Sequence, residues 1–290
     1  MEERKLTVLV TGATGKQGGA VARALLANGH RVRALTRSPE SVAAKELERL
    51  GADLVTGDFN NPVSLERAVK EMDAVFAMST PYEGGPDLET RQGIALADAA
   101  KAAAVRHFIY TSVAAADRST GIPFFDSKVP VEQHIRGLGI PYTILGPVFF
   151  MDNFLGPTWL PDLKKGRLTI ALPADRPLQQ IAVSDIGHFA ALVAENRDKC
   201  LGKRIELASD ELTPKQVCAS LTRACGKEIT YSEVPMRDLR ESNPGYAKLF
   251  EWFDRTGYNV DIAALRRDYP SVGWHTFAQW AKEQDLSALR

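Results

Sequence analysis

Residues 9–26 read LVTGATGKQGGAVARALL, and this stretch decides the fold. Glycines at Gly12, Gly15 and Gly18 stand between an apolar run and a run with helical character. A strand that passes through a glycine-rich turn into a helix is the context in which such a turn holds the phosphates of a dinucleotide. Gly12 permits a tight turn, Gly15 lets a pyrophosphate approach the backbone, and Gly18 lets the helix pack close to the strand. The unpaired amides of the first helical turn then face the phosphates.

The residues after the second apolar run indicate which dinucleotide is bound. The segment ALTRSP places Thr36, Arg37 and Ser38 where an NAD enzyme usually has Asp or Glu. An arginine fork and two hydroxyls favour a 2′-phosphate, and one charge-assisted hydrogen bond contributes about 1.5–3 kcal/mol, or about a ten- to hundredfold preference. We therefore expect NADP(H) to be preferred over NAD(H). The alternative is that Arg37 is a solvated surface residue, and the same alternative holds for Lys16 in the glycine turn.

Short apolar runs alternate with helical runs from residue 6 to about residue 146. This alternation, with strands apolar on both faces, predicts an α/β fold in which a Rossmann-type, doubly wound parallel sheet is covered by helices on both sides. The ligand crevice of such a sheet lies at the carboxyl ends of its strands. Strands are expected at Leu6–Val10, Val32–Thr36, Leu54–Thr56, Ala74–Ala77, Phe108–Thr111 and Tyr142–Gly146, and helices at Lys16–Asn28, Pro39–Leu50, Val63–Lys70, Leu88–Ala104 and Lys128–Leu138.

The pattern predicts two domains. An NADP-binding Rossmann domain is expected over residues 1–150, and a smaller C-terminal α/β substrate or cap domain over residues 151–290, partly interleaved with the first. In the second half, RIELAS and EITYSEV predict strands. The helix between them is expected to have Thr213 as N-cap, Pro214 in its first turn and Gly226 at its end. The final stretch is expected to form a helical cap with its aromatic side chains packed inward: Trp252, Phe253, Trp274, Phe277 and Trp280.

Composition excludes several classes of function. Lys plus Arg and Asp plus Glu number 36 each, so no net charge attracts nucleic acid or an anionic membrane, and no direct nucleic-acid binding is predicted. No basic-then-apolar leader and no uncharged run of 18 residues is present, so we expect a cytoplasmic protein without membrane contact. Cys200, Cys218 and Cys225 lack CxxC spacing, and core packing is favoured over a redox or metal role. No metal site is expected.

Five stretches together resemble the NmrA-like family, which are atypical, extended members of the short-chain dehydrogenase/reductase group. The stretches are TGATGKQGGAVARALLANGHRVRALTR, GDF at residues 57–59, FIYTSV at residues 108–113, SKVPVE and IPYTILGPVFFMDNF. The resemblance covers nearly the whole chain and implies a Rossmann fold with a small C-terminal domain. It also implies a set of NADP contacts: Gly12, Ala13, Thr14, Gly15, Lys16, Gln17, Arg37, Asp58, Phe59, Ser79, Thr80, Lys128, Phe150, Met151, Asp152 and Asn153.

Two pairs in this set follow strands. Asp58 and Phe59 come after the third expected strand, where an adenine would lie, and Ser79 and Thr80 come after the fourth, near the diphosphate and ribose. Each pair ends a strand on the crevice side, as the topology independently requires. Without the resemblance, Asp58 in TGDFNNP would be interpreted equally well as turn chemistry.

The catalytic residues of the broader group are only partly present. That group uses a Ser and a Tyr-x-x-x-Lys pair, but the matching stretch here is FFDSK, with Phe124 in the tyrosine position. Phenylalanine has no hydroxyl that could deliver a proton. Ser112 matches the serine and is a candidate for orienting a substrate. Lys128 matches the lysine, and Pro130 places it at the first position of a helix with Ser127 as N-cap.

Lys128 is the main catalytic candidate, and three roles remain open for it. It holds the ribose hydroxyls of the nicotinamide half, or acts as the acid itself as in the related isoflavone-reductase-like enzymes, or is a surface lysine with a solvated ammonium. The helical stripe Lys128, Val131, Ile135 and Leu138 places it on the edge that faces the core.

The missing tyrosine also bears on the substrate. Reduction of an unactivated ketone needs a proton at the developing alkoxide, whereas a quinone, dye or other conjugated acceptor gives a stabilised anion that water can protonate. Such acceptors need chiefly a flat aromatic pocket beside the nicotinamide. One cluster would supply that pocket, or would pack between the domains: Phe149, Phe150, Met151, Phe154 and Trp159. We therefore expect an NADPH-dependent oxidoreductase of quinone-like or other conjugated small molecules.

A second hypothesis belongs to a different class. Resemblance to regulatory NmrA-like proteins implies a redox sensor that binds NADP(H) and a protein partner with little or no catalysis. The sequence names no partner and leaves a homodimer open. A sugar epimerase is less favoured, because that chemistry also relies on the missing tyrosine.

Overall fold

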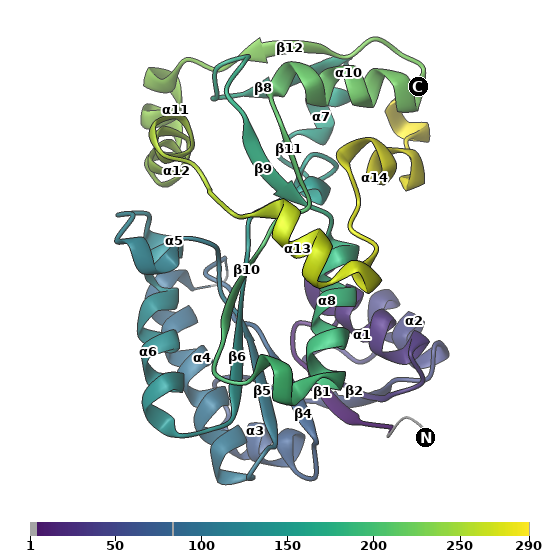
Figure 1. Cartoon of the computed structure of the whole chain (residues 1–290), viewed down its shortest axis with the longest axis vertical. Coiled ribbons are helices and arrows are strands. Elements are labelled where there is room, and N and C mark those ends of the chain that lie inside the picture. The colour runs from purple at the N-terminus through teal and green to yellow at the C-terminus, as the bar shows by residue number, and fades with distance from the viewer. Residues whose placement is uncertain (1–4, 83, 290) are drawn as a thin grey trace. The chain divides into compact units, whose positions relative to one another are not determined.

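The computed structural model describes residues 5–82 and 84–289, and the chain forms two compact units. The first unit comprises residues 1–119, 123–146 and 186–205, and the second comprises residues 120–122, 147–185 and 206–290. The chain thus leaves the first unit after Gly146 and returns to it at Ile186, as the colours of Figure 1 trace.

The first unit alternates strands and helices as the sequence predicts. Its strands are β1 (Thr7–Val10), β2 (Arg31–Thr36), β3 (Asp53–Thr56), β4 (Ala74–Ala77), β5 (His107–Thr111), β6 (Tyr142–Pro147) and β10 (Arg204–Leu207). Its helices are α1 (Lys16–Ala27), α2 (Val42–Arg49), α3 (Pro62–Val69), α4 (Gly85–Ala102), α5 (Pro123–Asp126), α6 (Lys128–Leu138), α8 (Val183–Glu195) and α9 (Arg197–Cys200), with a 3-10 turn at Ala116–Arg118.

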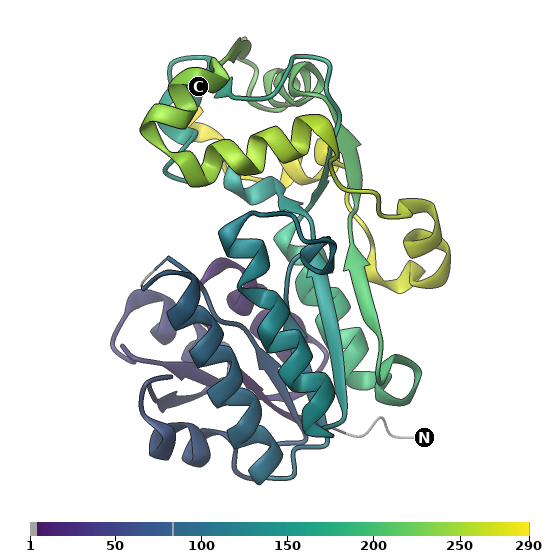
Figure 2. The ribbon, with the colours of Figure 1, turned by 90° about the vertical axis from the view of Figure 1, so that its left-hand side faces the viewer.

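The seven strands form one sheet in the order β10-β6-β5-β4-β1-β2-β3. The pairs β1–β2, β2–β3, β1–β4, β4–β5 and β5–β6 are all parallel. Successive strands are added outward from β1 in both directions, so the predicted doubly wound Rossmann topology is confirmed, with its switch point between β1 and β4. Helices α3, α4 and α6 cover one face, and α1, α2 and α8 cover the other (Figures 1 and 2).

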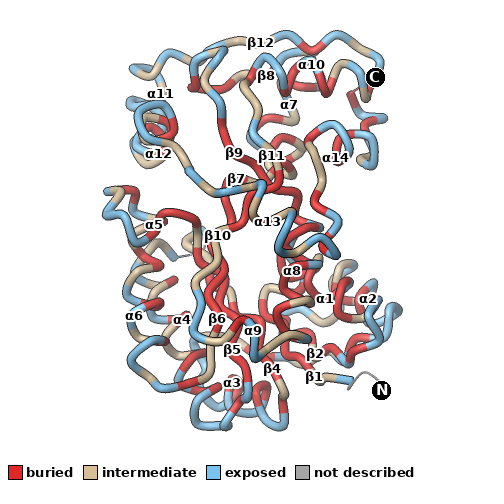
Figure 3. Tube along the Cα trace, viewed as in Figure 1, coloured by how far each residue is buried: buried red, intermediate tan, exposed pale blue. Residues whose placement is uncertain are grey.

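The central strands β1, β4 and β5 are buried along almost their whole length (Figure 3). On one face, Val75 and Phe108 of the sheet pack with Leu96 of α4 and Ile135 of α6 in a single apolar core. On the other face, α8 lies directly against α1, since a Cβ on Gly187 would lie 2.6 Å from the Ala20 carbonyl oxygen.

Two helix starts differ by three residues from the sequence prediction, and the start of α3 differs by one. Helix α2 begins at Val42 rather than at Pro39, because the Ser41 side chain accepts a hydrogen bond from the Ala44 amide and caps the helix there. Helix α4 begins at Gly85, three residues earlier than expected. Helix α6 has the predicted bounds, with Ser127 at its N-cap.

The second unit is a smaller α/β arrangement with two short sheets, β11-β9-β7 and β12-β8. Its strands are β7 (Phe149–Phe150), β8 (Arg167–Ile170), β9 (Leu178–Ile181), β11 (Asp210–Leu212) and β12 (Thr230–Glu233). Its helices are α7 (Leu160–Leu163), α10 (Pro214–Cys225), α11 (Met236–Ser242), α12 (Pro244–Arg255), α13 (Ile262–Asp268) and α14 (Phe277–Glu283), with 3-10 turns at Met151–Asn153, Pro270–Val272 and Ser287–Leu289.

Helix α10 confirms the expectation made from its caps. Thr213 and Gln216 form a capping box, and Gly226 closes the helix in the left-handed conformation. Cys218 and Cys225 are buried on its core stripe, and Cys200 is buried in the first unit, as core packing requires.

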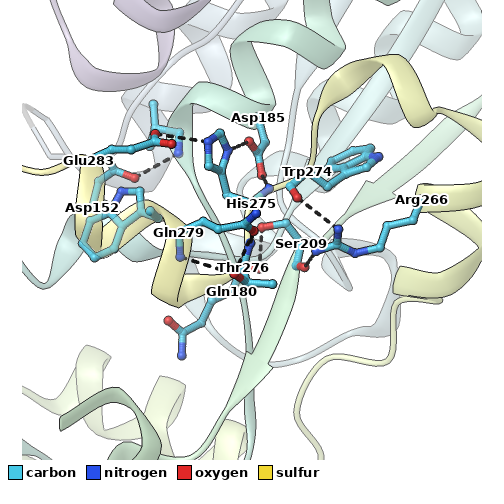
Figure 4. Close-up of polar contacts among 12 residues, drawn as sticks. Asp152, Gln180, Asp185, Ser209, Arg266, Trp274, His275, Thr276, Gln279 and Glu283 are labelled. Carbon is cyan, nitrogen blue, oxygen red and sulfur yellow. Dashed lines mark hydrogen bonds and ion pairs between the residues drawn. The ribbon is translucent and has the colours of Figure 1, made fainter. Parts of the chain in front are cut away.

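A buried carboxylate fixes the C-terminal segment within the second unit (Figure 4). Asp185, which has no exposed surface, accepts hydrogen bonds from the backbone amide of His275 at 2.9 Å and from its Nδ1 at 2.5 Å. The other ring nitrogen of His275 lies 3.2 Å from Glu283 of α14. Burial lowers the pKa of His275, but the hydrogen bond to Asp185 and the charges of both carboxylates outweigh it and leave the pKa raised.

Candidate functional site

The glycine turn has the geometry that its spacing predicts. Gly12 lies in the left-handed region with φ of +60°, and a Cβ there would lie 2.4 Å from the Met78 sulfur. A Cβ on Gly18 would lie 2.3 Å from the Gly12 carbonyl oxygen, so α1 packs against the turn more closely than any other residue allows.

The start of α1 is left open. Its N-cap is Gly15, which offers no side chain to cap the helix, and no acidic residue lies in the first turn. By contrast, Ser41 and Asn61 cap α2 and α3 with their side chains. The first amides of an α-helix have no intrahelical acceptor, and together with the helix dipole they favour an anion at this end.

A cavity of about 460 Å³ lies at the carboxyl ends of β1 to β4, within the first unit. Many of the predicted cofactor contacts line it: Gly12, Thr14, Gly15, Thr36, Arg37, Ser38, Asp58, Phe59, Ser79 and Thr80. The remaining lining residues were not among the predicted contacts: Leu35, Ser41, Ala43, Gly57, Met78 and Gln92. Of these, Ser41 carried a helix-cap signal, whereas nothing in the local sequence distinguishes Gln92.

Two lining residues also serve the local backbone. The hydroxyl of Thr36 accepts a hydrogen bond from the Ser38 amide at 3.1 Å. The Asp58 carboxylate accepts one from the Asn60 amide at 2.7 Å, which is the turn chemistry given as its alternative interpretation. Asp58 therefore lines the cavity and shapes the loop that carries it.

Other residues of the predicted turn set lie outside the cavity lining. Ala13 and Gly18 are buried, and Lys16 is exposed at the start of α1. The Gln17 side chain is buried, and its amide nitrogen donates to the Thr111 hydroxyl at 2.7 Å. This bond ties the start of α1 to the end of β5, so the Gln17 side chain has a structural partner.

Lys128 lies in a buried polar cluster and not at the surface, so the surface-lysine alternative is wrong. It is 8% exposed, and its ammonium donates to the Ser79 carbonyl oxygen at 3.0 Å and to Glu89 Oε1 at 2.5 Å. The Ser127 hydroxyl donates to the other oxygen of Glu89 at 2.5 Å. Glu89 was not predicted as a site residue, although it shares a helical stripe with the apolar Gly93, Leu96 and Ala100.

The end of β5 supplies further polar groups. The Ser112 hydroxyl is buried and has no hydrogen-bond partner within the described residues. Burial and the nearby Glu89 carboxylate raise the pKa of Tyr110 well above its usual value, so this phenol keeps its proton. Phe124, at the position of the missing tyrosine, is half-buried and packs edge-on against Phe125.

The aromatic cluster predicted as a substrate pocket is core packing within the second unit. Phe149, Phe154 and Trp159 are buried and contact one another at ring distances of 5.5–5.8 Å. Phe253 and Phe277 complete the cluster. The Phe149 and Trp159 rings meet edge to face, and the other two pairs are tilted, so these three side chains serve as core packing.

The segment from Phe150 to Asn153 also belongs to the second unit. Met151 is buried, and Phe150, Asp152 and Asn153 are partly exposed. The Asp152 carboxylate accepts a hydrogen bond from the Val183 amide at 2.9 Å. The predicted cofactor contacts of these four residues stay a prediction.

Two kinds of site are absent from residues 5–82 and 84–289, the part of the chain that the structure describes. No group of three or more His, Cys, Asp or Glu side chains is arranged to hold a metal ion. None of the helices there has the length and hydropathy needed to cross a membrane.

Comparison with known proteins adds to this geometry. The NmrA-like family model matches residues 4–280. A (4-alkanoyl-5-oxo-2,5-dihydrofuran-3-yl)methyl phosphate reductase of Streptomyces griseus is 32% identical, with 95% of this chain and 97% of the relative covered.

Solved structures of other proteins have a fold similar to that of this chain. The negative transcriptional regulator NmrA in complex with NADP has a TM-score of 0.78 and 25% identity, and its complex with NAD has a TM-score of 0.79, with 96% of this chain and 95% of that chain covered in both. An NADPH-dependent quinone oxidoreductase of Escherichia coli, complexed with NADPH, has a TM-score of 0.77 and 25% identity over 94% of this chain and 98% of its own.

Proposed function

Because the chain belongs to the NmrA-like family, we propose that it binds NADP(H) at the glycine turn and uses NADPH to reduce a conjugated small molecule such as a quinone. The observation that carries this proposal is the uncapped start of α1, which opens onto the cavity that Arg37 also lines. NmrA has been solved with NAD and with NADP, which supports a nicotinamide dinucleotide as the ligand.

The order of the strands in the sheet supports one orientation of the dinucleotide in the cavity. Arg37 and Asp58 follow β2 and β3, whereas Ser79 and Thr80 follow β4, on the other side of the glycine turn. A dinucleotide with its pyrophosphate on the turn and its 2′-phosphate at Arg37 therefore extends its nicotinamide half past Ser79. The Ser79 carbonyl is bonded to Lys128, so the nicotinamide side of the site is also the Lys128 side.

The preference for NADP(H) rests on the residues after β2. Arg37 and Ser38 are exposed in the cavity lining, and the positions from Thr36 to Ser38 hold no carboxylate that would repel a 2′-phosphate. Arg37→Ala should raise the Kd for NADPH about ten- to a hundredfold and leave the Kd for NADH nearly unchanged, as measured by calorimetry. Arg49→Ala removes the same charge from the exposed end of α2 outside the cavity and serves as the control. Equal losses for both nucleotides would contradict the proposed role.

The chemistry fits a conjugated acceptor better than a ketone. Bound NADPH supplies a hydride, and a quinone takes that hydride and one proton from water to give a hydroquinone and NADP⁺. The chain's part is to hold the nucleotide on the turn and to present Lys128 beside the nicotinamide ribose. Phe124 delivers no proton, which disfavours acceptors that need an acid.

Two relatives support this substrate class. The substrate in the name of the Streptomyces reductase contains a 5-oxo-2,5-dihydrofuran ring, whose C=C bond is conjugated with a carbonyl group. The Escherichia coli protein is a quinone oxidoreductase.

Loss of the reduced-nicotinamide absorbance tests the proposal directly. Purified protein is mixed with NADPH and either a panel of quinones and enones or a matched panel of unactivated ketones. We expect turnover with the first panel only. No turnover with any conjugated acceptor would overturn the proposed reaction, although nucleotide binding would be judged separately by calorimetry.

A redox-sensing regulator is the second candidate. It is favoured by Phe124 in the position of the acid and by the description of NmrA as a negative transcriptional regulator. Pull-downs and size-exclusion runs with NADP⁺ and with NADPH should then differ in partners or oligomeric state. Identical results in both redox states would count against this candidate.

A further inference from the structure

Glu89 is a buried carboxylate that the proposed reaction does not by itself explain. It lies in the second turn of α4 with no exposed surface. One carboxylate oxygen accepts from the Lys128 ammonium and the other from the Ser127 hydroxyl, each at 2.5 Å. Both partners come from the start of α6, 38 and 39 positions along the chain.

A second hydrogen bond from α4 also reaches the start of α6. The Thr90 hydroxyl donates to the Ser127 carbonyl oxygen at 2.8 Å. Adjacent residues of α4 therefore hold the N-cap of α6 through its side chain and its backbone. This double attachment fixes the first residue of α6, which is Lys128, relative to α4.

The position of the Lys128 ammonium is fixed by hydrogen bonds as well. It has three N–H donors, of which one is bonded to Glu89 and one to the Ser79 carbonyl. No acceptor for the third is found among the described residues. Since Ser79 lines the cavity, the ammonium lies just behind the wall on the nicotinamide side of the proposed site. One turn further along α4, Gln92 lines the same cavity.

The burial of this ammonium requires an opposite charge. An isolated ammonium in an apolar interior carries a large desolvation cost, and a carboxylate with good geometry offsets it. A neutral glutamine at position 89 would keep the shape of the side chain and its contact with Ser127 but would remove that charge.

We propose that Glu89 is a positioning residue that holds the Lys128 ammonium at the nicotinamide side of the dinucleotide site. The inference rests on the proposed function, because it assigns Glu89 a part in holding the same cofactor. Glu89 acts only through Lys128 and does not touch the nucleotide.

The test separates the two halves of the nucleotide. Glu89→Gln should raise the Kd for NADPH about ten- to a hundredfold, the loss expected when a charge-assisted contact is released. The Kd for adenosine 2′,5′-bisphosphate, which reaches only the Arg37 side, should stay within about twofold of the wild-type value. A purely structural role would weaken both ligands together, and that result would overturn the proposal.

Glu132→Gln is the matched control. Glu132 is buried one turn further along α6 and is paired with Arg204 at 3.1 Å, so its loss also breaks a buried ion pair. It makes no bond to Lys128, and its variant should keep the wild-type ratio of the two dissociation constants. The same change of ratio in both variants would overturn the proposal.

A double-variant cycle tests the route of the effect. If Glu89 acts through Lys128, Glu89→Gln combined with Lys128→Met should bind NADPH no more weakly than Lys128→Met alone. Additive losses would overturn the proposal. If Glu89→Gln fails to fold, Glu89→Asp keeps the charge but shortens the reach, and it should still show selective loss of NADPH binding; unchanged NADPH binding would refute the inference. Wild-type protein that binds neither ligand would refute the proposed function as well, which is a distinct outcome.

Discussion

Replacing Gly18 by alanine would test the close approach of α1 to the glycine turn. The new Cβ would lie 2.3 Å from the Gly12 carbonyl oxygen and 2.6 Å from that of Thr11, and both obstacles are backbone. Ordinary contact begins at 3.4 Å, so the start of α1 must move by about 1 Å. Overpacking of this kind costs about 1–3 kcal/mol of stability, which corresponds to a fall in Tm of about 2–12 °C.

The same movement should weaken nucleotide binding. If the first amides of α1 hold the pyrophosphate, a displacement of about 1 Å lengthens those hydrogen bonds and should raise the Kd for NADPH about ten- to a hundredfold. Gly15→Ala offers a contrast, because its Cβ would meet only the Gly12 carbonyl oxygen, at 3.3 Å, in a backbone conformation that alanine adopts readily. Since Gly15 lines the cavity, its methyl group should lower affinity while Tm stays within a few degrees of wild type.

Thermal melting and calorimetry with NADPH on the two variants form the assay. Gly137→Ala is the control, because nothing lies within 4 Å of its new Cβ inside α6, and alanine there should leave binding unchanged. Wild-type NADPH affinity in Gly15→Ala would refute the placement of the pyrophosphate. A wild-type Tm in Gly18→Ala would refute the packing estimate.

The remaining predictions concern pH. Burial, with the charge of Arg197, lowers the pKa of His107 to about 4 from its ordinary 6.5, so stability should fall by about 3 kcal/mol as pH drops from 6.5 toward 4, and urea unfolding of His107→Gln should lack this dependence. The pKa of His275 is raised, so its effect on stability has the opposite pH dependence. Its contribution to the free energy of unfolding is complete below pH 6.5 and is lost as pH rises through the pKa of the folded state. Urea unfolding from pH 6.5 upward should therefore show a flatter pH profile for His275→Gln, and an unchanged profile would contradict the role of the Asp185 contact.

The features that the sequence predicted well are local ones. The glycine turn depends on the φ of Gly12 and on the absence of a Cβ at Gly18, both of which are set within a few residues. The capping box of Thr213 likewise closes within three positions. Strand–helix alternation then leaves few topologies, so the doubly wound class of the central sheet could be predicted.

The features that were missed depend on partners far along the chain. Glu89 was not predicted as a site residue, because its ion-pair partner Lys128 lies 39 positions later at the start of α6. Strand β9 reads LQQI, and its glutamines hide a strand that is buried throughout. The Gln179 amide exchanges two hydrogen bonds with the backbone of Val260, 81 positions later, which is how a polar side chain is satisfied there.

The return of the chain to the first unit has a consequence for biosynthesis. Edge strand β10 completes the seven-stranded sheet and α8 covers one of its faces, yet most of α8 and all of β10 are synthesised only after residues 147–185, which belong to the second unit. The first unit therefore cannot be completed before residues 186–205 have been synthesised, although all of the cavity lining lies within residues 12–92. Until about residue 205 leaves the exit tunnel, β6 is an unpaired edge strand of the nascent chain. A chaperone would need to shield that edge.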